Sequence, residues 1–517
     1  MTETASKHID MTTGSLWRNI PLFAFPVAAT SILEQLSNLI ATVIIGNFSG
    51  DQGTLAMAAV GSNVPLTSLM LNLFIGLSLG SNVVIANAIG RGDRETVHRA
   101  VHTSIVTALI GGVLVAIFGQ LIAAGLMGLL NVPDDVYPLA LAYLRIYLLG
   151  MPVILLYNFE AAIFRSVGDT KVPLIALTVS GVLNVILNLF FVIVLKMNVN
   201  GVAIATVLSN AVSSVLLLRR LLHGDLVRVE LRELRIDRNA FNKIMRIGLP
   251  AGIQTAIFSL SNIIIQSAIN SLGTVVMAAS SAAFNIEIIA YDVLNSFSQA
   301  CTTFVGQNYG AGKIDRCKKT MFLCLIEDFI ASAAAIALVL LTGKYILAIF
   351  NSDPEVIAIG YTRLLFLFGS YIFTLTYEIL SGYLRGFGMG LTFAPLNLFS
   401  LKNLTQQDMA AAAGISNSIK QLAGSIGIAL LTVILSARTS YHAAHETISA
   451  AQTYVEGVTD ALRVVAVITL AALLPLLWVF RKKRPEKSGV KGAATPSPGE
   501  AVSGKTDKTT IYRTKPE

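Results

Sequence analysis

The sequence has 517 residues, of which 54% are hydrophobic and only 13% are charged. With a mean hydropathy of +0.69 it is too apolar for a soluble globular protein, whose surface must carry abundant charge. The net charge of +8 comes from basic residues gathered in every second loop, which follows the positive-inside rule and does not indicate a nucleic-acid-binding protein.

The hydrophobic runs have the length of membrane-spanning helices, because a hydrocarbon core of about 30 Å needs roughly 20 apolar residues per span. The polar segment 1–16 lacks the apolar core and cleavage site of a signal peptide, and we expect a cytoplasmic tail there. The predicted spans, in chain order, lie near 17–45, 55–88, 100–130, 138–164, 171–195, 201–222, 244–271, 275–307, 320–343, 358–384, 410–436 and 459–480.

The second half of the chain repeats the first. Pro26 with "SNLI" at 37–40 recurs as Pro250 with "SNII" at 261–264. "ANAIGRGD" at 86–93 matches "GQNYGAGK" at 306–313, and "FRSVG" at 164–168 matches "LRGFG" at 384–388, at one common offset. Since the first copy is about six helices long, an even number, we predict parallel repeats with a substrate cavity between them.

The predicted fold class is therefore an all-α integral membrane protein with two homologous helix bundles and about 12 transmembrane helices. The second bundle is atypical at its C-terminal end, where the repeat stops. The predicted parts are a cytoplasmic tail at 1–16, an N-lobe at 17–222, a basic cytoplasmic linker at 223–243, four C-lobe helices at 244–388, a diverged segment at 389–480 and a disordered cytoplasmic tail at 481–517.

Carboxylates inside the predicted spans are candidate ion-coupling residues, because a charge at mid-bilayer depth costs about 2.5 to 3.5 kcal/mol and needs a partner, water or a function. The four candidates are Glu34, Glu287, Asp292 and Glu378. Each could instead be a hydrogen-bonded core acid or, for Glu378, a charge at a helix end. Other acids lie nearer the predicted helix ends, where we expect them to reach toward water: Glu160, Glu327 and Asp328.

Polar side chains along the same spans are candidate substrate-binding residues. They are Asn38, Tyr157, Asn158, Asn262, Gln266 and Asn285. Single amides of this kind, including Asn184 and Asn188, could equally form interhelical hydrogen bonds.

Several motifs together resemble one transporter family. "IPLFAFPVA", "GLSLGSNVVIANAIGRGD", "YNFEAAIFRSVGDTKVP", "FNIEIIAYDVLNSF", "FVGQNYGAGK" and "YEILSGYLRGFG" are similar to the multidrug and toxic compound extrusion (MATE) family over about residues 14–388. The resemblance implies a twelve-helix, two-lobed antiporter of the cell membrane that expels cationic and amphipathic drugs by using a Na⁺ or H⁺ gradient.

One position departs from that family. Where related sequences carry an aspartate in the first helix, five residues before the glycine that ends it, this chain has Ala41. A methyl group binds neither a proton nor Na⁺. We predict that Glu34, two turns earlier on nearly the same face, replaces the aspartate. The alternatives are coupling in the C-lobe alone and no coupling at all.

The last hundred residues have a different resemblance. From about 385 to 484 the chain, including "GFGMGLTFAPLN" and "SNSIKQLAGSIGIAL", is similar to the C-terminal end of the fourteen-helix drug:H⁺ antiporters of the major facilitator superfamily. The shared "RGFG" would then be a junction. Residues 391–401 are too few to span the bilayer as a helix, so we predict a half-helix or re-entrant segment followed by two spans.

These patterns predict a transporter and not an enzyme. No GxxxxGK[ST] loop occurs, and Cys301, Cys317 and Cys324 lack metal-ligand spacing. We expect no metal and no cofactor apart from H⁺ or Na⁺ as the coupling ion. The expected partners are small amphipathic or cationic molecules and membrane lipids, with no nucleic acid and a monomeric assembly. The alternatives are an uncoupled flippase or facilitator for lipid-linked or sugar substrates, or a hybrid protein that transports nothing.

Overall fold

The computed structural model describes residues 9–130, 132–224, 227–270, 274–350 and 353–388, with short pieces at 437–438, 440–441 and 460. These residues belong to two compact units, Met1–Ser416 and Asn417–Glu517. In the second unit, Arg438 donates from Nε to Asp460 Oδ2 over 2.6 Å. The half-helix predicted at 391–401, the span at 410–436, the tail at 481–517 and nearly all of the span at 459–480 lie outside the described residues.

The described part of the first unit is helical, and its helices follow the predicted spans. Among the described residues, seven helices are long and apolar enough to cross a membrane, or eight if one bent pair counts as a single span. The all-α membrane fold is thereby confirmed. The helices are α1 (Leu16–Phe48), α2 (Gly53–Arg91), α3 (Arg94–Leu129), α4 (Tyr137–Leu149), α5 (Met151–Ser166), α6 (Lys171–Leu189), α7 (Asn198–Leu222), α8 (Arg238–Asn270), α9 (Thr274–Gly310), α10 (Ile314–Phe350) and α11 (Pro354–Gly386).

The internal repeat recurs in the positions of the helix ends. α3 begins at Arg94 and α10 at Ile314, and the ends of α5 and α11, at Ser166 and Gly386, have the same separation. The turns match as well, since the glycines that precede α3 and α10, Gly92 and Gly312, have φ of 71° and 73°. These values lie in the left-handed region that favours glycine, as the two Gly-containing motifs predict. Helices α1–α7 form the N-lobe and helices α8–α11 form the described part of the C-lobe.

The span predicted at 138–164 is broken in the structure. α4 and α5 meet at Gly150 and form an angle of 51°. Pro152 stands at the start of α5, where it cannot donate a backbone hydrogen bond to the preceding turn. Val207 also approaches so closely that a Cβ on Gly150 would lie 2.3 Å from its Cγ2 atom. The predicted span is therefore present as two helices with a bend between them and not as one continuous helix.

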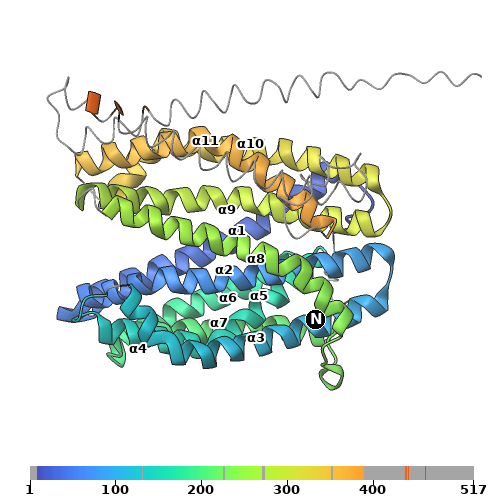
Figure 1. The fold of residues 1–517 in the computed structure, drawn as a ribbon, viewed down its shortest axis with the longest axis horizontal. Helices are drawn as coiled ribbons and strands as arrows, with labels where there is room; N and C mark the ends of the chain where they lie inside the picture. The colour runs from blue at the N-terminus through green and yellow to red at the C-terminus, as the bar shows by residue number, and fades with distance from the viewer. Residues whose placement is uncertain are drawn as a thin grey trace, which may run out of the picture. The chain divides into compact units, whose positions relative to one another are not determined.

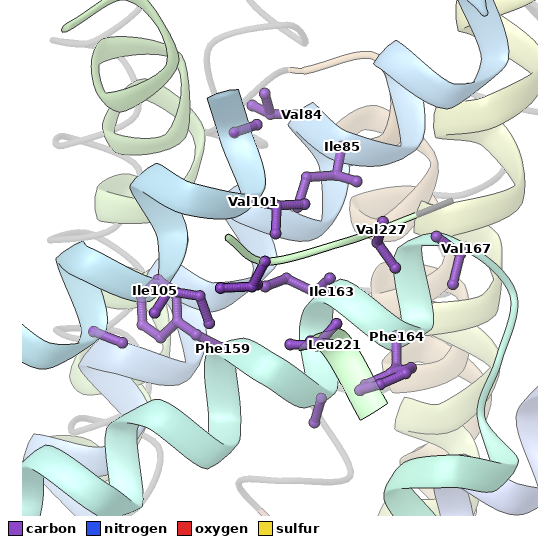
Figure 2. Close-up of a cluster of buried hydrophobic side chains, with 14 of the residues drawn as sticks. Val84, Ile85, Val101, Ile105, Phe159, Ile163, Phe164, Val167, Leu221 and Val227 are labelled. Atoms are coloured by element: carbon purple, nitrogen blue, oxygen red, sulfur yellow. The ribbon is translucent and has the colours of Figure 1, made fainter. Parts of the chain in front are cut away.

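A buried apolar cluster holds the N-lobe together. It joins α2, α3, α5 and α7, with Phe159, Ile163 and Leu221 near its centre (Figure 2). The linker that follows α7 packs into the same cluster through Val227 and Val229. Its backbone also donates to α3, from Glu230 N to His102 Nε2 over 2.9 Å. The linker is therefore fixed to the N-lobe.

α1 connects the two lobes. Its first half packs on α9 of the C-lobe through Phe23 and Val27, whereas its second half enters an N-lobe cluster through Ala41 and Ile45. In Figure 1 the helices α9, α10 and α11 lie side by side, with α2 to α7 on the other side of α8. The middle of α1 is thus the point at which one helix passes from one lobe to the other.

Candidate functional site

The two lobes are closed against each other at one end. We call it the basic end, because Arg91, Arg165, Arg246 and Arg385 lie in or beside its helix ends. Glycines bring the backbones together toward this end: a Cβ on Gly80 would lie 2.4 Å from the Ile244 carbonyl oxygen of α8, and a Cβ on Gly90 would lie 2.0 Å from the Gln307 carbonyl oxygen of α9. All residues of α2 from 81 to 88 are buried. The described structure is therefore sealed at its basic end.

Polar contacts cross the same closure. Gln307 Nε2 donates to the Ser166 carbonyl over 2.7 Å, and the Thr303 hydroxyl donates to Asn82 Oδ1 over 3.1 Å. Contacts of this kind hold the lobes in register. They can also be exchanged for water when the lobes separate, at a small net cost per hydrogen bond.

Residues 9–13, which we call the strap, cover this closure. The Met11 side chain is fully buried, and its carbonyl accepts from Asn308 Nδ2 over 3.0 Å and from Arg316 Nε over 3.2 Å. On the other side, a Cβ on Gly168 would lie 2.7 Å from the Ile9 carbonyl. The strap thus touches both lobes, so residues 9–13 are built into the fold and do not extend from it as a free tail.

Asp10 orders the strap. Its carboxylate accepts hydrogen bonds from the Thr13 hydroxyl and from the backbone N–H groups of Thr12 and Thr13, which hold the pKa of Asp10 below its ordinary value of 3.8. Because the pKa is lowered in the folded state, Asp10 stabilises the strap above pH 3.8 and loses this effect as the pH falls through the lowered value.

Removing residues 2–13 is expected to expose Cys317, which is fully buried in the same apolar cluster as Met11. A thiol-reactive maleimide should label the truncated protein and leave the full-length protein unlabelled. The same truncation with Cys317→Ala should not be labelled at that site. Equal labelling of full-length and truncated protein would show that the strap does not cover this end.

Glu34 is the exposed carboxylate at the middle of α1. Arg165 of the N-lobe interacts electrostatically with it, and so does Asp292 of the C-lobe. Tyr147 and Tyr157 also interact electrostatically with Glu34. A carboxylate that is accessible, central along its helix and within reach of charges from both lobes can bind a cation in competition with Arg165.

Glu378 lies in a buried network of the C-lobe. Its Oε2 atom is 3.8 Å from Arg385 Nη2, its Oε1 atom accepts from the Tyr291 hydroxyl over 3.2 Å, and Ser298 donates to its carbonyl over 2.8 Å. Arg385 also donates to the Ser298 hydroxyl over 2.9 Å. The negative charge of Glu378 is therefore held by a fixed guanidinium.

Glu287 has a cationic partner that the sequence analysis missed. Its Oε2 atom lies 3.6 Å from Arg363 Nη2, and both side chains are about a quarter exposed. Arg363 also donates to the Ser280 carbonyl over 2.9 Å, which fixes it between α9 and α11. A cation inside the predicted span 358–384 was the signal, since such a charge needs an acidic partner nearby.

Asp292 differs from the other three candidates. It is buried, and its Oδ2 atom has no hydrogen-bond partner. Within the described ranges no cationic side chain forms an ion pair with it. Its electrostatic neighbours are acidic or phenolic, namely Glu34 and Tyr371. Asp292 and Glu34 therefore oppose each other across the lobes as like charges.

The candidate substrate-binding residues are dispersed. Asn38 is exposed on α1, and Asn158 and Asn285 are half-buried, each donating to the carbonyl one turn earlier in its own helix. Tyr157 is buried, with no hydrogen-bond partner for its hydroxyl. Asn262 and Gln266 lie in α8, in the part whose side chains fall outside the described ones.

Ala41 occupies an apolar environment. It is buried beside Ile44 and Ile45 in the N-lobe cluster that Val185 of α6 joins. Asn184 and Asn188 of the same helix form a hydrogen-bond chain in which Asn188 Nδ2 donates to Asn184 Oδ1 and Asn184 Nδ2 donates to Ser209. This part of the N-lobe keeps polar groups. At position 41, where the family resemblance implies an aspartate, it has only the methyl group of Ala41.

Arg165 and Arg385 occupy equivalent positions in the repeat, at the basic ends of α5 and α11. Each faces an acid, Glu34 for Arg165 and Glu378 for Arg385. The repeated motifs "FRSVG" and "LRGFG" place an arginine at the same position in each half, so the sequence already indicated that the two arginines are equivalent. The two arginines give the lobes related, though not identical, acid–base sites.

Three further acids are buried, contrary to prediction. Glu160 and Asp328 are fully buried and Glu327 is 6% exposed, so none of them reaches water at a helix end. Glu160 Oε2 accepts from the Ser214 hydroxyl over 2.9 Å, whereas its Oε1 atom has no partner. The observed helices pack these acids against neighbouring helices, which the hydropathy pattern does not reveal.

Metal ligation has no geometric support in the part of the chain that the structure describes. No group of three or more His, Cys, Asp or Glu residues there could hold a metal ion. Cys301, Cys317 and Cys324 are free and buried, in agreement with their expected place in the apolar interior.

Comparison with known structures identifies the fold. A crystal structure of MATE in complex with MaL6 has a TM-score of 0.71 and 20% sequence identity, over 93% of this chain and 100% of that chain. A structure described as the outward-facing conformation of a multidrug resistance MATE family transporter has the same TM-score and identity. At this identity the likeness concerns the fold alone.

Relatives in sequence share most of their length with this chain. It is 27% identical to the probable multidrug resistance protein YoeA of Bacillus subtilis over 75% of this chain and 85% of that protein. It is 25% identical to the probable multidrug resistance protein NorM of Thermotoga maritima, over 71% and 79%. The FAD transporter of Shewanella oneidensis is also 25% identical, over 65% and 77%.

The family model MatE matches residues 26–190 and 250–406, which together make up more than half of the chain. The two matched segments fall on the two halves of the internal repeat. The second segment continues past Gly388, where the repeat stops in the sequence. The chain therefore belongs to the MatE family of multidrug and toxic compound extrusion transporters.

Proposed function

We propose that this protein is a secondary antiporter that exports cationic or amphipathic molecules across the cytoplasmic membrane in exchange for H⁺ or Na⁺. The basic end would face the cytoplasm, with both termini there, since positive residues favour that side. The protein would act as a monomer among lipids. The observation that carries the proposal is Glu34, an exposed carboxylate in the middle of α1 that interacts with Arg165 of one lobe and Asp292 of the other.

The mechanism follows from the charges around Glu34. An ionised Glu34 attracts a cationic substrate, and Arg165 and Asp292 set the strength of that attraction with opposite signs. When Glu34 binds the coupling cation instead, its charge is neutralised and the substrate loses its partner. Substrate and coupling ion then exclude each other, which is the requirement for exchange.

Alternating access would use the closure at the basic end. The glycine contacts between α2 and α8 seal that end in the described structure, and the strap covers it. Separation of the lobes there would require release of the strap and of the polar contacts that cross the closure. α1, which packs on both lobes, would transmit the state of Glu34 to this movement.

Glu34→Gln is expected to lower the initial rate of gradient-driven ethidium efflux from proteoliposomes by about tenfold or more, which corresponds to about 1.4 kcal/mol. The amide keeps the size of the side chain but carries no negative charge and takes up no proton. The measurement is repeated with the proton gradient and the Na⁺ gradient collapsed in turn. The gradient whose collapse stops wild-type efflux identifies the coupling ion.

Glu95→Gln provides the matched control, because Glu95 is an exposed acid at the start of α3 that pairs only with Arg99 among the described residues. Its efflux should equal that of the wild type. Efflux by Glu34→Gln at the wild-type rate would exclude Glu34 as the coupling residue. Transport that survives collapse of both gradients would favour an uncoupled facilitator, and no ethidium transport by the wild type would favour a different substrate or an inert protein.

We also propose that residues from about 385 to 484 share ancestry with the C-terminal end of fourteen-helix major facilitator antiporters. Support comes from the sequences "GFGMGLTFAPLN" and "SNSIKQLAGSIGIAL" and from the loss of the internal repeat after Gly388. Two spans after Arg385 would return the basic "RKKR" segment to the cytoplasm, in line with the positive-inside rule.

A further inference from the structure

α10 carries two adjacent buried acids in the interior of the C-lobe. Asp328 is fully buried and Glu327 is 6% exposed. Both oxygens of Glu327 and the Oδ2 atom of Asp328 have no hydrogen-bond partner, whereas Asp328 Oδ1 accepts from the Ser332 hydroxyl over 3.0 Å. Asp328 lies about 20 Å along α10 from the start of the helix at Ile314. Burial at this depth excludes contact with bulk water.

The charges around Asp328 are mostly of its own sign. Glu378 of α11 interacts with it electrostatically, and Glu327 precedes it on α10. Cys324 contacts Cys301 of α9 and interacts electrostatically with both Glu327 and Asp328. α1 adds apolar side chains to the cluster that contains these cysteines. No basic group from any of these elements pairs with Asp328 within the described ranges.

Arg385 is the cation of this region, and it is already engaged. It pairs with Glu378 and donates to Ser298. The pair Glu378–Arg385 is neutral as a unit, so it offers no compensation for a second negative charge. An ionised carboxylate buried without a partner is strongly disfavoured, and the group takes up a proton instead.

We propose that Asp328 is a proton-binding site of the C-lobe, beside the Glu378–Arg385 ion pair. The inference rests on the proposed function, since it assigns the C-lobe proton of the exchange to Asp328. The unpartnered oxygens of Asp328 and Glu327 are the observation that requires a ligand here. The described residues contain no group of three or more His, Cys, Asp or Glu that could hold a metal ion, whereas a proton needs one oxygen.

The proton is bound and released without any other reactant. On release, the O–H bond at Asp328 Oδ2 breaks, the electron pair stays on the oxygen and the proton passes to water that enters when the lobe opens. On binding, the reverse occurs. The site loses its negative charge, and the repulsion between Asp328 and Glu378 is removed.

The test detects the bound proton by its spectrum, independently of transport. Infrared difference spectra of the full chain in lipid, recorded in H₂O and D₂O at neutral pH, should show the carbonyl stretch of a protonated carboxylic acid. Asp328→Asn should remove one such band, and Glu355→Gln, at an exposed acid near the start of α11, should leave it in place. Persistence of the band in Asp328→Asn would overturn the assignment.

A second variant keeps the test decisive if Asp328→Asn does not fold. Ser332→Ala removes the hydrogen bond to Oδ1 and should shift the frequency of the same band, because the carbonyl of the neutral acid loses its donor. An unchanged frequency would contradict the assignment. An Asp328 band together with efflux that ignores both the proton gradient and the Na⁺ gradient would refute the proposed function and leave the proton site standing. Replacement of the band by a Na⁺-dependent change would identify a metal-ion site instead.

Discussion

Gly90→Ala should prevent the lobes from closing at the basic end, whereas Gly61→Ala in the same helix should leave the closure intact. A Cβ on Gly90 would lie 2.0 Å from the Gln307 carbonyl oxygen, and its nearest neighbours are backbone atoms, so no flexible side chain can move away. A Cβ on Gly61 would have no side chain and no backbone of another helix within 4 Å. Overpacking of this kind costs about 1 to 3 kcal/mol, and every 1.4 kcal/mol shifts the equilibrium about tenfold toward the open end.

Spin labels at Lys171 and Asp315, exposed residues of the N-lobe and C-lobe at the basic end, measure the closure directly once the three native cysteines are replaced. The distance distribution should lengthen for Gly90→Ala and match that of the unsubstituted background for Gly61→Ala. Both substitutions raise helix propensity by about 1 kcal/mol, so a general effect on α2 would appear in both. Identical distributions for the two variants would show that the glycine contact does not govern closure.

Most of the described helices could be predicted from the sequence. Each long apolar run within the described ranges became a helix because lipid leaves backbone groups no other partner, and the offset between the repeated motifs reappears in the helix ends. The break at Gly150 was missed because it depends on the approach of Val207 from another helix. The strap was missed because a polar segment is usually a tail, and the donors that fix it, among them Asn308 and Arg316, come from distant parts of the sequence.

The candidate site was predicted less completely. Hydropathy located the acids, because a charge in an apolar run is visible in one dimension. It did not locate their partners, since Arg363 is distant from Glu287 in the sequence and meets it only through the packing of α9 on α11. The predicted span 320–343 placed Glu327 near a helix end, but α10 begins at Ile314 and buries that acid. The coupling roles of Glu34, Glu287, Asp292 and Glu378 remain predictions.

Arg385→Ala should destabilise the protein more than Arg363→Ala, although each substitution breaks one ion pair with an acid of the C-lobe. The side chains of Arg385 and Glu378 are 8% and 11% exposed, whereas those of Arg363 and Glu287 are 24% and 23% exposed. Removing one partner of a buried pair leaves an uncompensated charge and costs about 3 to 5 kcal/mol. Water can solvate much of the charge that Arg363→Ala leaves behind, so that substitution should cost less.

The buried cysteines provide the measurement, because a thiol-reactive fluorophore reaches Cys301, Cys317 and Cys324 only when the helices separate. The melting temperature should follow the order wild type, Arg363→Ala, Arg385→Ala, from highest to lowest. The double variant Arg385→Ala, Glu378→Gln should melt above Arg385→Ala, since it removes the orphaned charge together with the pair. A double variant that melts below Arg385→Ala would mean that Glu378 stabilises the C-lobe through Tyr291 and Ser298 and not through its charge.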